Sequence, residues 1–149
     1  MLMISHADIY PINTFPLLWR WNQASHAVLS NEEITSIEPL VESKSEELQD
    51  IIIRLKKNNS QGDPYLINAE GSDEEVSTLL NNLALENELV FVSWHEDTAV
   101  RMPLSLFIHR WSDFCYPSSD DVSILPTSEG WMLEYWHYEM FTWTKLNAT

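Results

Sequence analysis

Cysteine, glycine and basic residues are all scarce in this chain of 149 residues. Because Cys115 is the one cysteine, no intramolecular disulfide can form, which fits a reducing compartment. The three glycines are too few for a glycine-rich phosphate-binding loop. The sequence also lacks the roughly 18 consecutive apolar residues of a membrane span and the basic and apolar regions of a signal peptide. We therefore expect a cytoplasmic protein with no membrane contact.

Acidic residues outnumber basic ones by 23 to 8, which leaves a formal net charge of −15. A field of this sign repels the phosphate backbone of nucleic acids, and no basic stripe offsets it. We therefore expect no nucleic-acid partner. The same field would attract a basic protein partner, although a strong net charge also keeps a protein soluble without any partner.

Length and composition favour one domain. A chain of this size is about one domain long, and its 44% of hydrophobic residues supply ample material for a core. No internal repeat and no Gly/Ser-rich linker divides the chain. The polar stretch over residues 58–64 is typical of a turn between two elements. We predict a single domain over residues 1–149.

Three serine–glutamate pairs, each three residues apart, predict helix starts as capping boxes. Apolar residues at helical spacing follow the second pair from Leu48 to Leu55 and the third pair from Val76 to Leu83. Pro103 suits the first position of a fourth helix that reaches Phe114. The three pairs are Ser30–Glu33, Ser43–Glu46 and Ser72–Glu75.

The second half of the chain is rich in β-branched and aromatic residues, which favour strands. Residues 89–94 and 99–102 predict one hairpin, and residues 122–125 and 131–143 predict another around the turn at 126–130. Antiparallel strands with separate helices beside them are typical of an α+β fold. We predict an antiparallel sheet of about four strands with helices packed beside it.

The last of these strands is the most distinctive segment of the chain. In an extended strand, residues two apart share a face, so His137 and Glu139 would project together beside Tyr135 and Phe141. A His-x-Glu pair can supply two metal ligands, or a base and the carboxylate that orients it. A two-residue pattern is short, however, and polar positions on a partly exposed strand fit it as well.

Both faces of this strand carry rings, whereas an ordinary half-exposed strand alternates apolar and polar residues. One face would pack under the helices. The other, with Trp136 and Tyr138 near Glu134, would be covered by a loop or by a partner, because Trp and Tyr are frequent at binding hot spots. A central strand covered on both sides explains the rings equally well.

Two adjacent carboxylates, Asp120 and Asp121, follow two serines. They could stabilise a turn, bind a divalent cation or offer charge to a partner, and turn chemistry is the simplest of these interpretations. No residue is assigned a catalytic, cofactor-binding or metal-binding role, and no cofactor is expected. The predicted binding surface consists of Asp120, Asp121, Glu134, Trp136, His137, Tyr138 and Glu139.

Two segments resemble a small family of acidic bacterial proteins of unknown function. They are Trp-Ser-Asp-Phe-Cys-Tyr-Pro-Ser-Ser-Asp-Asp over residues 111–121 and Gly-Trp-Met-Leu-Glu-Tyr-Trp-His-Tyr-Glu-Met-Phe over residues 130–141. The resemblance would span most of the chain and implies no catalytic residue. In acidity, size and rings the chain is also similar to small α+β immunity proteins such as the SMI1/KNR4-type group. That similarity implies a protein that neutralises a toxin by direct binding.

Two functions follow from these observations. The leading hypothesis is a cytoplasmic protein-interaction module, such as an immunity-type or regulatory inhibitor of a basic partner, rather than an enzyme. The alternative is a small-molecule or metal-dependent enzyme centred on His137 and Glu139. The sequence predicts no oligomeric state.

Overall fold

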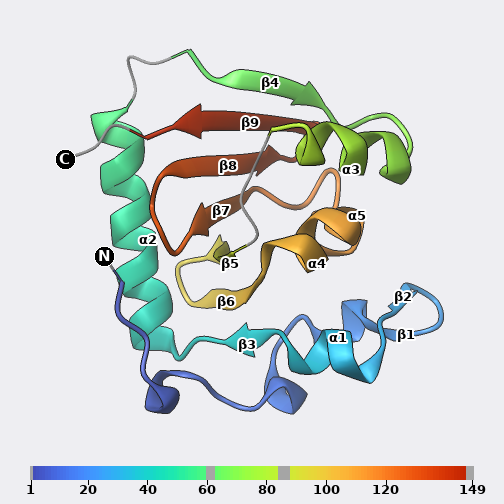
Figure 1. Ribbon diagram of the computed structural model, residues 1–149. Coiled ribbons are helices and arrows are strands. Elements are labelled where there is room, and N and C mark those ends of the chain that lie inside the picture. The colour runs from blue at the N-terminus through green and yellow to red at the C-terminus, as the bar shows by residue number, and fades with distance from the viewer. Residues whose placement is uncertain (1, 60–62, 84–87, 147–149) are drawn as a thin grey trace.

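A seven-stranded antiparallel sheet organises the part of the chain that the computed structural model describes, which is residues 2–59, 63–83 and 88–146 (Figure 1). The strands lie in the order β3-β6-β5-β7-β8-β9-β4. A separate two-stranded ribbon pairs β1 (Asn22–Gln23) with β2 (Ala27–Val28). The strands of the main sheet are Glu38–Pro39 (β3), Tyr65–Asn68 (β4), Leu89–His95 (β5), Thr98–Pro103 (β6), Val122–Pro126 (β7), Trp131–Trp136 (β8) and Met140–Lys145 (β9).

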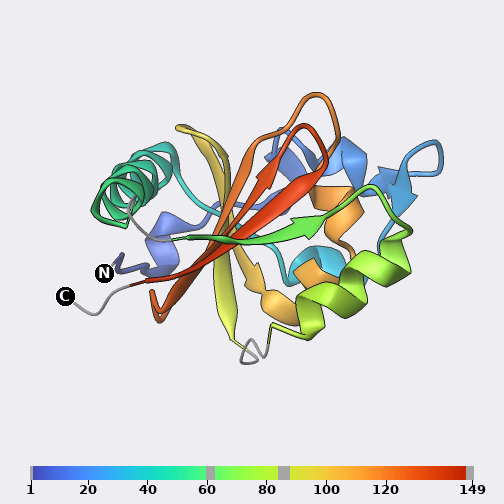
Figure 2. The ribbon, with the colours of Figure 1, turned by 90° about the horizontal axis from the view of Figure 1, so that it is seen from above.

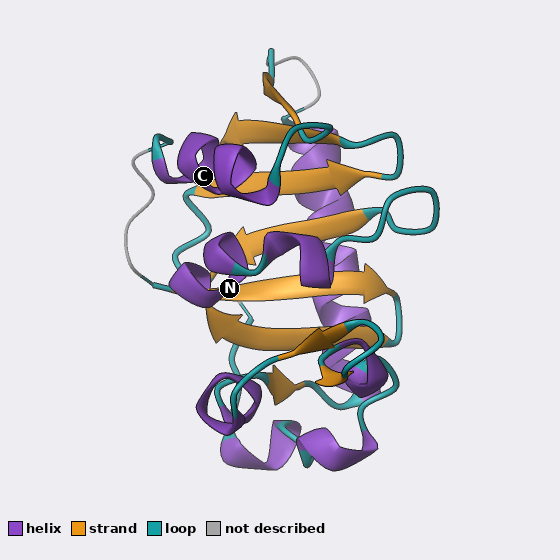
Figure 3. Ribbon diagram, turned by 90° about the vertical axis from the view of Figure 1, so that its right-hand side faces the viewer, coloured by secondary structure: helices purple, strands orange, loops and turns teal. Residues whose placement is uncertain are grey.

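Helices cover the two faces of this sheet unequally. The longest, α2, lies alone across one face, and the other α-helices lie on the opposite face (Figures 2 and 3). No helix in the described residues is long and apolar enough to cross a bilayer. The α-helices are Asn31–Thr35 (α1), Glu42–Asn58 (α2), Asp73–Asn81 (α3), Leu104–His109 (α4) and Trp111–Phe114 (α5), and single 3-10 turns occur at His6–Asp8, Ile12–Thr14 and Leu18–Arg20.

The predicted α+β class is confirmed, but the prediction of about four strands is wrong. The two edge strands, β3 and β4, have two and four residues, too short for a periodic pattern to reveal them. Their pairing with β6 and β9 defines them instead. The segment 131–143, predicted as one strand, forms most of two strands. Residues 60–62 of the predicted turn over 58–64 lie outside the described residues.

The helix caps predicted from the sequence form where no tertiary contact competes with them. The Ser30–Glu33 capping box is present, with both hydrogen bonds made, and Ser72 caps α3 by accepting from the Glu75 N–H. The capping box predicted at Ser43 is wrong, because α2 already begins at Glu42. The residue before α2 is held by the N-terminal segment, because the Val41 N–H donates to the Asp8 carbonyl at 2.8 Å. The predicted fourth helix is interrupted at Arg110, whose ψ of 24° is not helical.

Side chains alternate between two cores, as strand geometry requires. We call the face that carries Leu133, Tyr135 and Phe141 the aromatic face, and it packs under α3, α4 and α5. We call the opposite face the α2 face, where Phe91, Leu125, Met132 and others contact Leu48, Ile51 and Ile52 of the helix. The helix contacts β5 and β6 most, so it leaves the β8–β9–β4 side of its face less covered.

Candidate binding groove

The segment from Trp131 to Lys145 is a hairpin and not one long strand. Strand β8 ends at Trp136, residues 137–139 turn, and β9 returns with Met140 opposite Trp136. The Glu139 N–H donates to the Trp136 carbonyl at 2.9 Å, and Glu139 takes the left-handed conformation, with φ of 62°. Such three-residue loops usually have glycine at this position, so the sequence carries no strong turn signal here. His137 and Glu139 therefore do not share a strand face.

The hairpin places its buried rings on the aromatic face. Tyr135 and Phe141 are direct cross-strand partners, 1% and 0% exposed, with ring centroids 5.1 Å apart in an edge-to-face arrangement. Trp111 of α5 contacts both rings. Burial raises the pKa of Tyr135 well above its ordinary value, and the nearby Cys115, Glu139 and Asp120 add to that rise. These rings belong to the hydrophobic core, in agreement with the prediction that one face of the ring-rich segment packs under the helices.

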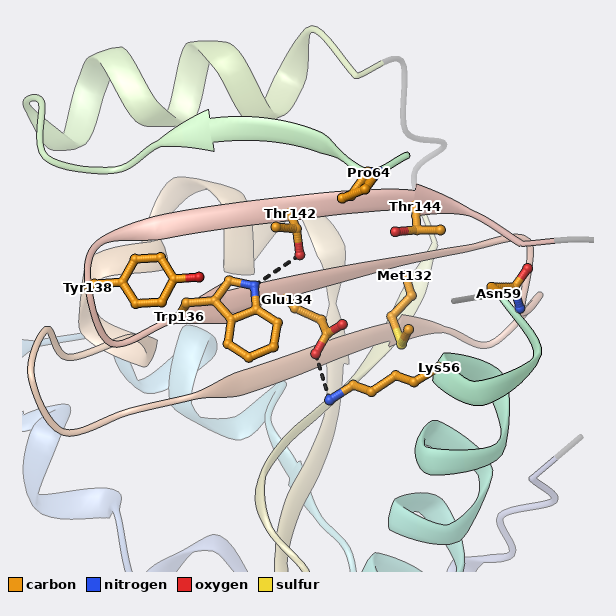
Figure 4. Close-up of a pocket in the computed structure, with 9 residues that line it drawn as sticks. All are labelled: Lys56, Asn59, Pro64, Met132, Glu134, Trp136, Tyr138, Thr142 and Thr144. Atoms are coloured by element: carbon orange, nitrogen blue, oxygen red, sulfur yellow. Dashed lines mark hydrogen bonds and ion pairs between the residues drawn. The ribbon is translucent and has the colours of Figure 1, made fainter. Parts of the chain in front are cut away.

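The α2 face of the same hairpin lines an open groove beside the C-terminal end of α2 (Figure 4). The groove has a volume of about 340 Å³. Its residues come from the last turn of α2 and the residue after it, from the segment just before β4, and from the hairpin. They are Lys56, Asn59, Pro64, Met132, Glu134, Trp136, Tyr138, Thr142 and Thr144.

Polar contacts hold the groove wall in place. The Lys56 ammonium lies 2.6 Å from the Glu134 carboxylate and 5.7 Å from the centre of the Trp136 ring. The Trp136 indole N–H donates to the Thr142 hydroxyl at 3.0 Å. Trp136 and Tyr138 stack with an interplanar angle of 13°, and Tyr138 is 58% exposed. The groove thus presents ring surface that is already ordered.

A second hollow of about 200 Å³ shares Lys56, Glu134 and Trp136 with the groove and adds Asp121 and Ser123, among others. The Lys56–Glu134 ion pair therefore borders both hollows. Through these shared residues the two hollows form one surface that includes the carboxylates of Glu134 and Asp121 and the ring of Trp136.

The two adjacent aspartates lie in different environments. Asp120 is only 8% exposed, and its carboxylate accepts two hydrogen bonds from the Arg20 guanidinium, at 2.7 and 3.2 Å. The same guanidinium lies 3.9 Å from the centre of the Tyr116 ring. Asp120 is therefore an internal group that ties the N-terminal segment to the loop before β7. Asp120 was predicted as part of the binding surface, but its burial removes it from any exposed surface.

Asp121, in contrast, is exposed and anchors the β8–β9 turn. Its carboxylate accepts from the His137 backbone N–H at 2.8 Å and lies 2.9 Å from the His137 ring nitrogen. Partial burial raises the pKa of Asp121, but the hydrogen bonds from His137 outweigh it and leave the pKa below its ordinary value of 3.8. This pair orders the turn that carries Tyr138.

Glu139 lies apart from His137. It lines a different hollow of about 160 Å³, next to Cys115, Tyr135 and Asp73. Cys115 is fully buried, and that burial raises the pKa of its thiol. Within residues 2–59, 63–83 and 88–146, no cluster of three or more His, Cys, Asp or Glu side chains is arranged to hold a metal. The geometric reason for pairing His137 with Glu139 is thus removed.

The structure brings together five of the seven residues predicted as a binding surface. Glu134, Trp136 and Tyr138 line the groove, while Asp121 lines the adjoining hollow and contacts His137. Sequence reasoning missed Lys56 and Thr142, which complete the wall. Lys56 lies in the last turn of α2, where the helix dipole favours a cation without any further role. Its position one turn after the buried Ile52 was a signal that it also borders the sheet.

No protein-family model, curated protein or solved structure matches this chain. The family resemblance seen in the sequence therefore stays a prediction.

Proposed function

We propose that this protein is a protein-interaction module that binds a basic protein partner through the groove. The observation that carries the proposal is an ordered pair of rings, Trp136 and Tyr138, set among carboxylates on an open sheet face. An immunity-type or regulatory inhibitor, which neutralises a basic protein by direct binding, is a molecule of this kind.

Electrostatics supports a basic partner. The chain carries a formal charge of −15, and the carboxylates of Glu134 and Asp121 border the two hollows. Within the groove the charges of Lys56 and Glu134 offset each other, so the attraction comes from the net charge of the chain and from Asp121 in the adjoining hollow. A field of this kind accelerates encounter with a positively charged surface and disfavours partners of the same sign.

The rings support affinity. Trp and Tyr side chains bury large areas with little loss of conformational freedom, which is why they dominate binding hot spots. The hydrogen bond from Trp136 to Thr142 and the stacking on Tyr138 reduce that loss further. The half-buried Met140 lies opposite Trp136 and extends the apolar surface.

The test is affinity capture from cells that express the protein, followed by binding of the purified candidate to wild type and to a groove variant. We expect the affinity for a basic partner to fall with rising salt, and Trp136→Ala to cost about 2 kcal/mol or more of binding free energy. Circular dichroism and unfolding curves would verify that the variant is folded.

The matched control is Trp19→Ala, since Trp19 is a partly exposed tryptophan that does not line the groove. A partner that binds Trp136→Ala and wild type equally, or that binds without any dependence on salt, would contradict the proposal.

A further inference from the structure

The two edge strands of the sheet differ in how far other segments cover them. At one edge, β3 has only two residues, and Pro39 lacks a backbone N–H. The N-terminal segment covers it, because the Tyr10 N–H donates to the Pro39 carbonyl at 3.1 Å and Ile9 bridges to Leu40. At the other edge, β4 pairs with β9 on one side and forms the end of the strand order. It is the outermost strand in Figure 1.

The outer side of β4 presents unused backbone groups. The Ala69 N–H donates to the Glu139 carbonyl at 2.9 Å, and the register pairs Ile67 with Phe141 and Tyr65 with Trp143. Because bonding residues alternate in an antiparallel pair, the N–H and C=O groups of Leu66 and Asn68 point away from β9. Elsewhere in the described residues, no backbone group hydrogen-bonds to them.

The side chains of β4 leave this edge apolar and open. Tyr65 and Leu66 are 56% and 60% exposed and lie on opposite faces, so both sides of an added strand would meet apolar surface. Protected edges usually carry lysines or bulges, and β4 has neither. Leu66 lies opposite Thr142, a groove residue, so the α2 side of β4 continues the groove floor.

Charge decides between two possible occupants of this edge. Asp63 and Glu70 flank β4, and both are exposed. A second copy pairing antiparallel with β4 would bring Asp63 of one chain near Glu70 of the other, and both copies carry the same net charge. A basic segment would instead place its cations beside these carboxylates.

We propose that an extended basic segment of the partner protein adds to the sheet as a strand next to β4. Its backbone would bond to Leu66 and Asn68, and its side chains on the α2 face would lie toward Trp136 and Tyr138. This inference rests on the proposed function and specifies its binding mode. Main-chain hydrogen bonds supply affinity in such strand addition, and side-chain pockets supply selectivity.

The test uses a short synthetic peptide of alternating lysine and valine as the probe, with calorimetry and amide hydrogen exchange as readouts. We expect binding with slowed exchange at Leu66 and Asn68. Leu66→Pro removes an outward N–H without breaking a bond to β9, so it should weaken binding about tenfold. Leu66→Ala keeps the N–H and is the matched control.

A peptide with N-methylated backbone on one edge gives the same test without altering the protein, and it should also bind about tenfold more weakly. Strand addition is contradicted if Leu66→Pro binds the peptide as tightly as wild type does and the methylated peptide binds as tightly as the unmethylated one. If Trp136→Ala still weakens binding in that case, the groove remains the binding site. If a glutamate–valine peptide binds as well as the basic one, the proposed function fails too. A homodimer in sedimentation that Leu66→Pro dissociates would show that the occupant is a second copy and would overturn the inference.

Discussion

The two faces of the β8–β9 hairpin are built from alternating residues of the same strands, yet they have different roles. On the aromatic face, Tyr135 and Phe141 are excluded from solvent and pack on Trp111. On the α2 face, Trp136 is partly exposed and contacts Thr142 and Tyr138. The aromatic face carries Trp131, Tyr135, Phe141 and Trp143 of the two strands, whereas the α2 face carries Trp136. The exposure of a ring depends on whether a helix covers its position, so a ring in a strand acquires its role from the opposing layer.

Asp120 and Asp121, which are adjacent in the loop before β7, also differ in exposure. One carboxylate is buried against Arg20, and the other is exposed and holds the turn at His137. Two adjacent residues of identical chemistry thus differ in role: Asp120 contributes to the interior and Asp121 to the exposed surface.

The largest expected difference between the faces is in core packing. Phe141→Ala should lower the free energy of unfolding by about 3–5 kcal/mol, because the cavity would remain between Tyr135 and Trp111. Thr142→Ala, one residue away on the α2 face, should cost about 1 kcal/mol through loss of its bond with Trp136. Urea unfolding of both variants measures this difference, and equal losses would contradict the assignment of the two faces.

The two aspartates should differ in how much each contributes to the free energy of unfolding. Asp120→Ala should lower the free energy of unfolding by about 3 kcal/mol or more, since it leaves the Arg20 guanidinium buried without its counter-charge. Asp121→Ala should cost less than about 1 kcal/mol, because its partner is solvent-exposed. Thermal and urea unfolding at neutral pH give both values. A larger loss at Asp121 would reverse our assignment of the buried and exposed carboxylates.

Alkaline pH should destabilise the fold through the buried Tyr135 on the aromatic face. The folded state keeps Tyr135 protonated where the unfolded state ionises near its ordinary pKa of 10.0. The stabilisation of the folded state that comes from this difference in pKa is fully present below that pH. It is lost as the pH rises above it, at up to about 1.4 kcal/mol per pH unit. Tyr135→Phe should therefore lose less stability than wild type above pH 10. Identical alkaline profiles for Tyr135→Phe and wild type would contradict the burial of this hydroxyl.

The smallest effect is expected at the turn that joins the two strands. Glu139 has a φ of 62°, which costs L-residues with a side chain about 1 kcal/mol or more relative to glycine. Glu139→Gly should therefore raise the free energy of unfolding by about 0.5–1 kcal/mol. Glu139→Ala keeps the strained backbone and should bring no such gain, so it separates strain from charge. A destabilised Glu139→Gly would show that the carboxylate contributes more than the backbone costs.

Prediction from sequence succeeded where local chemistry is decisive. Ser30 and Ser72 do cap helices, and β5 and β6 form the hairpin that the β-branched and aromatic content of residues 89–94 and 99–102 predicted. It failed where pairing over long distances decides. The edge strands β3 and β4 have no periodicity of their own, and the turn at Glu139 lacks the glycine that usually marks such a loop. For the candidate site, the chain pattern indicated Trp136 and Tyr138, but Lys56 joins them only because α2 crosses the sheet beside β8.

The sequence by itself determined the α+β class, the strong negative charge and the supply of rings near the C-terminus, because composition and local periodicity are properties of the chain alone. Only the tertiary structure decided which rings are core, which of two adjacent aspartates is buried, and which sheet edge is left open. Those outcomes depend on the layer that packs against each strand. The ring-rich segment is therefore half core and half groove, divided by the alternation of its strands and by the reach of one helix.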